Sequence, residues 1–265
     1  MNQTIIALLT TVCNFELYNK TSKLFPEGIE LYVIDGRNGM HGIDSLCYMF
    51  KVLKDKNIDY LILADEDVVF KDSQVVFSLV EKMINENCWV CGVRDGGIIQ
   101  HRVFNPNVVN TFFTILNFRE IAKIWRKEEI FKNQYVKEGE FSTKGVNFKS
   151  NYDEMSLYEP YYCFFLWLKR NGSKFIYLDS DMADDGITNK VKFNDRFFLY
   201  HTWYARSYNK NEKHTVRINT ILEEEVLGRE LRETENVVVF YDLFFNLKRR
   251  FRKYKAKFIK KVMLK

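Results

Sequence analysis

Leu61-Ile62-Leu63-Ala64-Asp65-Glu66-Asp67 is the stretch that decides how this chain folds. A short apolar run of the kind that forms a buried strand ends in three consecutive acids. Three carboxylates at one strand end repel one another, so a cation among them would stabilise the arrangement. Asp65 and Asp67 point to the same side of an extended backbone, because side chains alternate along a strand. Such an Asp-x-Asp pair can hold a hard divalent metal, Mn²⁺ or Mg²⁺, together with substrate phosphates.

The same acids also fit a plain loop before a helix. Asp72 and Ser73 are typical N-cap residues, and acidic side chains suit the positive end of a helix dipole. The triplet alone does not choose between a metal site and an acidic loop, so the pattern around it has to decide.

Around the triplet, short apolar strands alternate with amphipathic helices. The expected strands are 5–12, 29–34, 60–64, 88–93, 174–178 and 197–200, and the expected helices are 14–25, 44–56, 73–85, 108–131, 159–170 and 212–232. This alternation predicts an α/β fold with a mostly parallel, Rossmann-like sheet flanked by helices. In such sheets ligands bind beyond the carboxyl ends of the strands, where Asp35 and the acidic triplet fall.

Composition points to an ordered intracellular protein. The chain has 265 residues, 46% of them hydrophobic and only 3 prolines, which is typical of a well-filled core. No apolar run reaches the ~20 residues that span a bilayer, and the 5–12 run lacks the basic start of a signal peptide. The 5 cysteines are scattered, so we expect free thiols rather than a disulfide framework. A cytoplasmic location is the expectation.

Positive charge is concentrated at the C-terminus. Residues 248–265 contain ten of the 40 Lys and Arg residues and no acid, which leaves 30 basic against 35 acidic residues in the rest of the chain. Apolar residues recur there at helical spacing: Phe244, Leu247, Phe251, Tyr254, Phe258 and Val262. We therefore predict two parts, a catalytic domain over 1–235 and an amphipathic basic helix within 236–265.

A basic helix with an apolar stripe is typical of attachment to an anionic membrane surface, over 244–265. Nucleic-acid binding explains the charge but not the wide apolar face, and we predict no nucleic-acid partner. Packing of the stripe against the body of the protein or against a partner subunit is the third reading. The sequence does not give the oligomeric state.

The order of these motifs resembles GT-A glycosyltransferases of the family-two type. The resemblance runs from a strand ending at Asp35, through a Gly-rich turn near Gly39 and the Asp65-Glu66-Asp67 motif, to the block 158–178. It implies an inverting, metal-dependent transferase of the hexosyltransferase class, with a UDP-sugar as the favoured donor, although the same sheet and motif also occur with retention. Together with the basic tail, it implies a lipid-linked glycan or glycolipid acceptor at the inner membrane face, in bacterial envelope polysaccharide or lipopolysaccharide assembly.

The resemblance also assigns roles to particular residues. It implies metal ligands at Asp65, Asp67 and His201, and donor or nucleotide contacts from Thr10, Asp35, Asp65 and Arg94. Pro160 stands where the family carries its catalytic Asp. The candidate bases are therefore Glu159, Asp153 and Glu154. Alternatively, the acceptor supplies a group that reacts with little help from a base. Plain turns at Asp35 and Arg94 and a structural histidine at His201 are the alternative readings.

Two other functions remain open. A nucleotidyltransferase would use a similar metal–nucleotide site, but it usually carries a Gly- and Lys/Arg-rich phosphate loop after the first strand, where this chain has Thr10-Thr11-Val12-Cys13-Asn14. A catalytically inactive membrane scaffold would keep the fold, and Pro160 is the residue that favours it.

Overall fold

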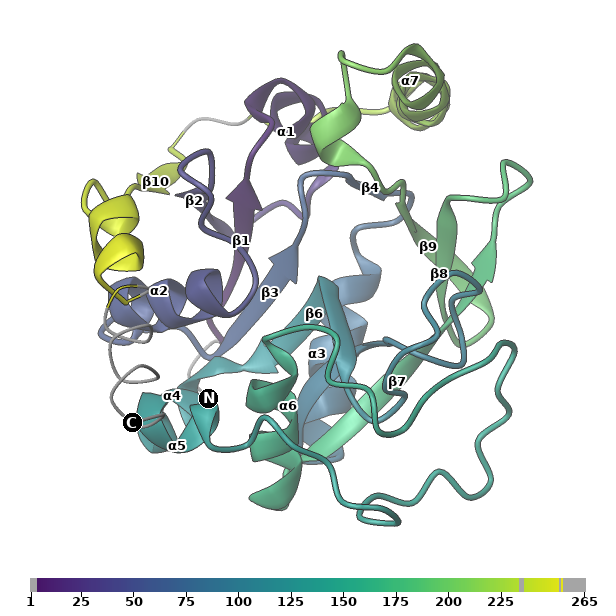
Figure 1. Cartoon of the computed structure of the whole chain (residues 1–265). Coiled ribbons are helices and arrows are strands. Elements are labelled where there is room, and N and C mark those ends of the chain that lie inside the picture. Colours follow the sequence, from purple (N-terminus) through teal and green to yellow (C-terminus); the bar gives the residue numbers. More distant parts are fainter. Residues whose placement is uncertain (1–3, 234–235, 253, 255–265) are drawn as a thin grey trace.

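The computed structural model describes residues 4–233, 236–252 and 254, which form one mixed sheet with helices on both faces (Figure 1). The sheet has ten strands in the order β10-β2-β1-β3-β6-β5-β7-β8-β9-β4. The strands are β1 Ile6–Val12, β2 Glu30–Asp35, β3 Tyr60–Ala64, β4 Val68–Phe70, β5 Cys88–Arg94, β6 Val109–Asn117, β7 Lys174–Met182, β8 Asn189–Phe193, β9 Arg196–His201 and β10 Val238–Phe240. The helices are α1 Phe15–Thr21, η1 Ser22–Leu24, α2 Ile43–Leu53, α3 Val75–Asn85, α4 Phe118–Ile124, α5 Lys127–Phe131, α6 Tyr162–Arg170, η2 Ala205–Ser207 and α7 Glu212–Val226.

The predicted mostly parallel sheet is not confirmed, because the sheet is mixed. β10, β2, β1 and β3 pair in parallel, and so do β5 and β7. β6 runs antiparallel between β3 and β5, and β8, β9 and β4 add antiparallel strands at one edge. The first part of the helix expected over 108–131 is therefore strand β6. Its side chains are buried on both faces, so the period of two that identifies a half-buried strand is missing from its sequence.

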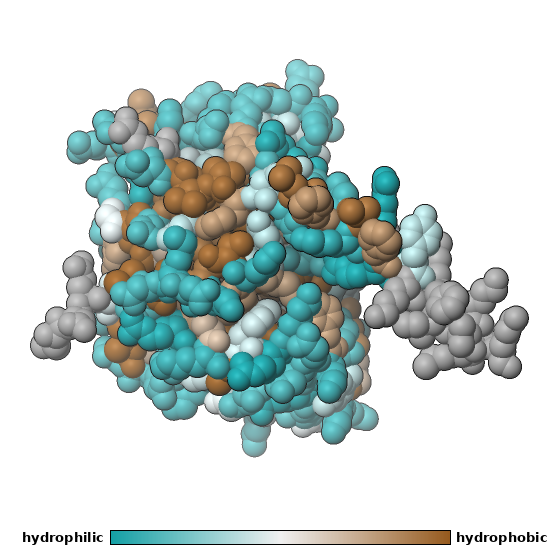
Figure 2. All heavy atoms as spheres, turned by 90° about the vertical axis from the view of Figure 1, so that its left-hand side faces the viewer, coloured by the Kyte–Doolittle hydropathy of each residue, from teal (hydrophilic) through white to brown (hydrophobic). Residues whose placement is uncertain are grey.

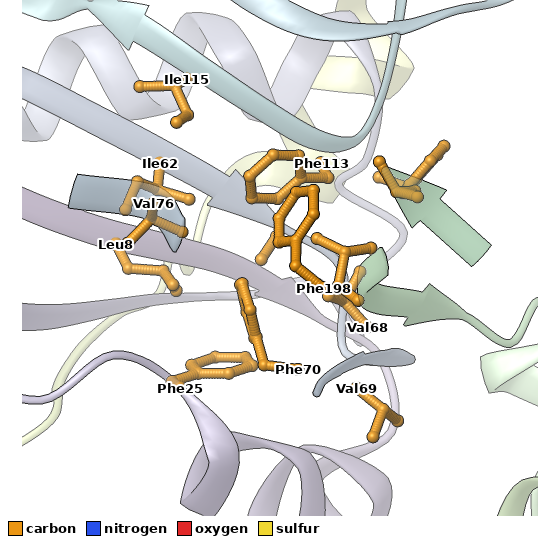
Figure 3. Close-up of a cluster of buried hydrophobic side chains, with 14 of the residues drawn as sticks. Leu8, Phe25, Ile62, Val68, Val69, Phe70, Val76, Phe113, Ile115 and Phe198 are labelled. Atoms are coloured by element: carbon orange, nitrogen blue, oxygen red, sulfur yellow. The ribbon is translucent and has the colours of Figure 1, made fainter. Parts of the chain in front are cut away.

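Two hydrophobic cores lie on opposite faces of the sheet, because successive strand residues point to opposite sides. Leu8 of β1 and Ile62 of β3 belong to the first core, which α1, α3 and α7 cover. Figure 3 shows these two residues packed with Phe70 and Phe113 in that core. Leu9 and Leu61, their neighbours, belong to the second core, which α2, α4, α5 and α6 cover. Burial on both faces explains the near-continuous apolar strands of the sequence.

Asp72 and Ser73 do not cap α3, because its N-cap is Gln74 and no side chain caps it, but two other helix ends carry clear local signals. The side chain of Asn14 accepts a hydrogen bond from the Leu17 backbone N–H at 3.2 Å and caps α1. α6 ends at Asn171, and Gly172 follows with φ of 78°, a left-handed conformation that suits glycine.

The antiparallel edge positions one end of the candidate site. β4, a strand that we did not expect, pairs with β9 so that Val68 lies opposite His201. β8, also unexpected, pairs with β9 on its other side. The predicted strand 197–200 is thereby fixed from two sides, and the register of β4 brings His201 next to the end of the acidic triplet.

The C-terminal segment packs onto the body of the protein. β10 pairs in parallel with β2 at the outer edge of the sheet, and a helix over 245–252 follows beside α2 (Figure 1). Phe245 is buried in the second core, whereas Phe244, Leu247, Phe251 and Tyr254 of the predicted stripe are exposed. Phe258 and Val262 lie outside the described residues. Within the described part of the chain, no helix has the length and apolarity needed to span a membrane.

Candidate functional site

A cavity of about 460 Å³ opens beyond the carboxyl ends of β1 and β3. Asp65, Asp67 and His201 are among its lining residues, and each offers a ligand atom to a group whose atoms lie within 4.8 Å of one another. The three predicted metal ligands, far apart in sequence, thus meet in one place. Carboxylate oxygens and an imidazole nitrogen are a donor set that Mn²⁺ or Mg²⁺ accepts.

Backbone and aromatic contacts hold this cluster in place. The backbone carbonyl of Asp67 accepts hydrogen bonds from the backbone N–H and the hydroxyl of Thr202, both at 3.0 Å. The ring of His201 stacks on Phe112, with centroids 4.0 Å apart and an angle of 11°. His201 Nε2 lies 3.3 Å from Asp67 Oδ1, while its buried Nδ1 has no hydrogen-bond partner among the described residues. The imidazole is therefore fixed with one nitrogen toward the acids.

The electrostatics of the triplet favour a bound cation. Burial raises the pKa of Asp65 well above its ordinary value, and the charges of Asp67 and Glu66 add to the effect. Burial and the charge of Asp67 raise the pKa of Glu66 to about 7. A raised carboxyl pKa means that the local field opposes negative charge. A divalent cation would reverse that field, so the residues present fit a metal.

Glu66, the middle acid, has a structural role that the sequence did not reveal. Its Oε1 accepts the backbone N–H groups of Cys13 and Asn14, at 3.0 and 3.1 Å, at the start of α1. The alternative reading of the triplet as helix-capping acids thus holds for Glu66, but for α1 and not for α3.

Two cationic or titratable side chains at the cavity were missed from the sequence. Arg206 of η2 lines the cavity, and its charge lowers the pKa of Asp65 against the larger effect of burial. His41 is another lining residue. Arg206, His41 and Cys13 also line a second cavity of about 540 Å³, which contains Phe15 and Arg37. Because both cavities share these three residues, they form one extended binding region.

Glu159 is the predicted base that reaches the cavity. Its side chain is 28% exposed, and Oε1 accepts a hydrogen bond from Arg102 Nη2 at 3.2 Å. Arg102 in turn donates Nε and Nη2 to the two carboxylate oxygens of Asp95, each at 2.7 Å. Asp95 is fully buried and also accepts from Asn110 and Tyr162, at 2.8 and 2.6 Å. This network fixes the guanidinium group that faces Glu159.

The other predicted side chains do not line either cavity. Asp153 caps a turn by accepting the Met155 backbone N–H at 2.9 Å, and Glu154 accepts from the Thr143 hydroxyl at 2.7 Å. Thr10 is buried on the sheet face of the first core, opposite the cavity side of β1.

Asp35 and Arg94 do not line the cavities either, and each contacts another side chain instead. Asp35 Oδ2 accepts a hydrogen bond from Arg37 Nη2 at 2.6 Å, and this bond, together with the guanidinium charge, lowers the pKa of Asp35. Asp35 therefore positions Arg37, which does line the second cavity. Arg94 is buried, with its guanidinium carbon 3.4 Å from the centroid of the Tyr177 ring.

No protein-family model matches the sequence, and no curated protein matches it either. Solved structures that are similar to the chain include two transferases. One is the crystal structure of a glycosyltransferase involved in the glycosylation of the major capsid of PBCV-1, with 16% identity and a TM-score of 0.33, covering 45% of this chain and 64% of that chain. The other is mouse xyloside xylosyltransferase 1 in its apo form, with 10% identity and a TM-score of 0.39, covering 68% of this chain and 86% of that chain. This chain thus spans less than two thirds of the first structure. Both likenesses are distant, so the function has to be argued from the site.

Proposed function

We propose that this protein is a metal-dependent, inverting glycosyltransferase that moves a sugar from a nucleotide-diphosphate sugar to a hydroxyl group. The Asp65–Asp67–His201 cluster at the cavity is the observation that carries the proposal. The order of motifs, which resembles the GT-A glycosyltransferases, supports it. On the strength of the resemblance, a UDP-sugar is the favoured donor and a hexosyl group is the favoured transferred group.

The two joined cavities match the size and the charge of such a donor. The second cavity, with Phe15 and Arg37, would hold the nucleoside, and the first would hold the sugar. The diphosphate would then lie at their junction, where Arg206 and His41 stand. The backbone N–H groups of Cys13 and Asn14 are not free for phosphate binding, because both donate to Glu66. The negative diphosphate would thus depend on Arg206 and on a metal.

Asp65, Asp67 and His201 would hold the Mn²⁺ or Mg²⁺ ion. When bound, such an ion acts as a Lewis acid that stabilises negative charge developing on the leaving diphosphate. Arg206 adds a fixed positive charge on the same side of the junction. These residues together would lower the barrier to breaking the bond between the sugar and the diphosphate.

Glu159 is the base that we propose. The acceptor oxygen would attack the anomeric carbon while the bond from that carbon to the diphosphate oxygen breaks and the diphosphate leaves with the electron pair. The hydroxyl proton would pass to the Glu159 carboxylate, and direct attack from the opposite side inverts the anomeric configuration. Arg102, held by Asp95, would keep the Glu159 carboxylate oriented. Asp153 and Glu154 are weaker candidates because they do not line the cavity.

The acceptor that we favour is a lipid-linked glycan or glycolipid at the inner face of the cell membrane. The basic, apolar C-terminal segment supports this choice, since a lipid-linked acceptor stays in the bilayer. The same segment supports a peripheral membrane location for the protein. Assembly of a surface polysaccharide or lipopolysaccharide is the process that the resemblance favours.

The test is release of nucleoside diphosphate from a panel of nucleotide sugars, with Mn²⁺, with Mg²⁺ and with chelator. We expect metal-dependent release with one nucleotide class. Glu159→Gln should lower kcat by roughly 10²–10⁴-fold with little change in the donor KM, since a base acts in the chemical step. Arg206→Gln should instead raise the donor KM as well. The exposed Glu81→Gln variant is the control and should leave both constants unchanged.

The rival functions give different results in the same assays. A nucleotidyltransferase would release pyrophosphate from a nucleoside triphosphate and a sugar phosphate instead. An inactive scaffold would release nothing from any donor, whether or not metal binds. Either result would overturn the proposed transfer reaction.

A further inference from the structure

The C-terminal segment exposes a continuous apolar surface, which we call the docking face. It consists of five side chains with exposed fractions of 52–77%: Leu243, Phe244, Leu247, Phe251 and Tyr254. Figure 2 shows hydrophobic surface gathered in patches on the side of the molecule where β10 and the helix over 245–252 lie. Single exposed apolar residues are ordinary, but a contiguous group on one helix indicates an interaction surface.

Helix geometry separates this face from the side that packs on the protein. At about 100° per residue, Phe244, Leu247, Phe251 and Tyr254 fall on one side of the helix. Phe245, Arg249 and Arg252 fall on the other side. The contacts agree, because Phe245 is 4% exposed and Arg252 Nη1 lies 2.8 Å from Asp44 Oδ1. The body therefore anchors one side of the helix, and the other side faces outward.

Basic side chains border the docking face. Lys248 and Arg250 lie roughly 80° to either side of its centre. From residue 248 onward the sequence holds ten Lys and Arg residues and no acid, whereas the rest of the chain carries 30 basic and 35 acidic residues. Lys248 also pairs with Asp242 at 2.8 Å, which holds it beside the face. Apolar side chains flanked by cations match a surface that offers both negative charge and hydrocarbon.

We propose that the docking face binds the surface of an anionic lipid bilayer. Apolar side chains would enter the boundary between headgroups and acyl chains, and the cations would contact negative headgroups. A second copy of the chain is a poorer occupant, because two tails with ten positive charges each would repel. A nucleic acid would use the cations but would leave Leu243, Phe244 and Leu247 exposed to water.

The helix also touches the rim of the active-site cavity. Asn38 Nδ2 donates to the Asp242 backbone carbonyl at 3.3 Å, and Arg252 pairs with Asp44 at the start of α2. Between these two contacts lie His41 and Gly42, which line the cavity. Docking would therefore hold this rim close to the bilayer. The consequence that the acceptor enters from the lipid surface rests on the proposed function, whereas bilayer binding itself does not.

The test is sedimentation of the full chain with vesicles, in low salt without donor or metal. One set of vesicles is neutral phosphatidylcholine, and the other contains anionic phosphatidylglycerol as well. We expect binding to the anionic set at least ~10-fold tighter than to the neutral set, with a marked loss in high salt. The double variant Leu247→Glu/Phe251→Glu should lose at least ~10-fold of this binding, because it removes two apolar contacts and adds two negative charges.

A matched control places the same charges on other exposed apolar positions. Ile84→Glu/Val216→Glu alters side chains that are 47% and 58% exposed on α3 and α7, and it should bind vesicles like the unmodified protein. Circular dichroism of both variants verifies that the fold is intact.

Three results would overturn the proposal. The first is no binding to anionic vesicles, and the second is an equal loss of binding in both double variants. The third is that the unmodified protein is a dimer and only the docking-face variant is a monomer. Preference for a DNA duplex over anionic vesicles would also overturn it. Failure of the transferase reaction is a separate result, since vesicle binding is measured without donor. If vesicles bind but donor turnover fails, the docking face stands and the proposed function does not.

Discussion

Replacing Asp67 by Asn should change the stability of the protein in opposite directions with and without a divalent metal. Asp67 and Asp65 offer ligand atoms within 4.8 Å of each other in a partly buried site. At an effective dielectric constant of about 20, two full charges 4.8 Å apart would repel by roughly 3.5 kcal/mol. Asp65 avoids most of this repulsion through its raised pKa. We therefore expect the metal-free variant to gain roughly 1 kcal/mol, or about 2 °C in Tm.

With metal the order should reverse. A metal at 100 times its Kd adds about 2.7 kcal/mol to the unmodified protein. At about 2.1 cal/mol/K of unfolding entropy per residue, this corresponds to about 5 °C for 265 residues. In Asp67→Asn the amide would keep an oxygen for His201 Nε2, and the backbone contacts to Thr202 do not involve the side chain. The variant should thus fold normally but shift by less than about 1 °C with metal.

The assay is thermal unfolding in Mn²⁺, in Mg²⁺ and in chelator. Asp55→Asn, an exposed position in the turn after α2, is the control and should behave like the unmodified protein in all three. A metal shift that survives in Asp67→Asn would refute the assignment of Asp67 as a ligand. Absence of any shift in the unmodified protein, with either metal, would refute the metal site.

Two further predictions concern stability. Asp95→Asn should destabilise the protein by about 3–5 kcal/mol in urea unfolding, because Arg102 loses its buried bidentate counter-charge and keeps only the partly exposed Glu159. The exposed-pair variant Asp181→Asn should cost at most about 1 kcal/mol. Burial lowers the pKa of Lys169 to about 8, whereas we expect its ordinary value of 10.5 in the unfolded chain. Between pH 8 and 10.5 the folded protein has released this proton and the unfolded chain still binds it, so the free energy of unfolding should rise with pH. The advantage of Lys169→Met over the unmodified protein should accordingly shrink by about 2 kcal/mol between pH 7.5 and 9.5, with Tyr177 still bonded to the Asn107 carbonyl, and a constant difference would contradict the buried charge.

The part of the fold that sequence alone could predict is the part with a clear local signal. Asn14 and Gly172 mark helix ends by their own chemistry, and the predicted helices 14–25 and 159–170 start and end beside them. β6 has no such signal, because both of its faces are buried and an apolar run of that kind fits a helix equally well. The antiparallel β6 inside the sheet and the antiparallel β8, β9 and β4 at its edge make the sheet mixed, and together they account for the largest error in the fold.

The candidate site likewise contains residues that the sequence pointed to and residues that it did not. Asp65 and Asp67 follow the predicted strand 60–64, and the resemblance supplied His201. The three residues meet because β9 pairs antiparallel with β4. Arg206 belongs to η2 after β9, and its place at the cavity depends on the pairing of β9 with β4, which the sequence did not indicate. Arg94 was misjudged because one residue of register decides whether a strand-end side chain faces the cavity or the packed interior. It turns to Tyr177, and its neighbour Asp95 organises Arg102 and Glu159 instead.

The three residues of the acidic triplet contribute both to the stability of the fold and to the proposed metal site. All three acids line the cavity, and the Glu66 carboxylate also accepts the backbone N–H groups of Cys13 and Asn14 at the start of α1. The helix end gains from the negative charge of Glu66, and the same charge raises the pKa of Asp65. The Glu66 carboxylate, which caps α1, thus adds negative charge next to Asp65 and Asp67. A bound cation would offset this charge. The fold and the proposed metal chemistry are therefore coupled at this strand end, and a bound metal should stabilise α1 as well as the cavity.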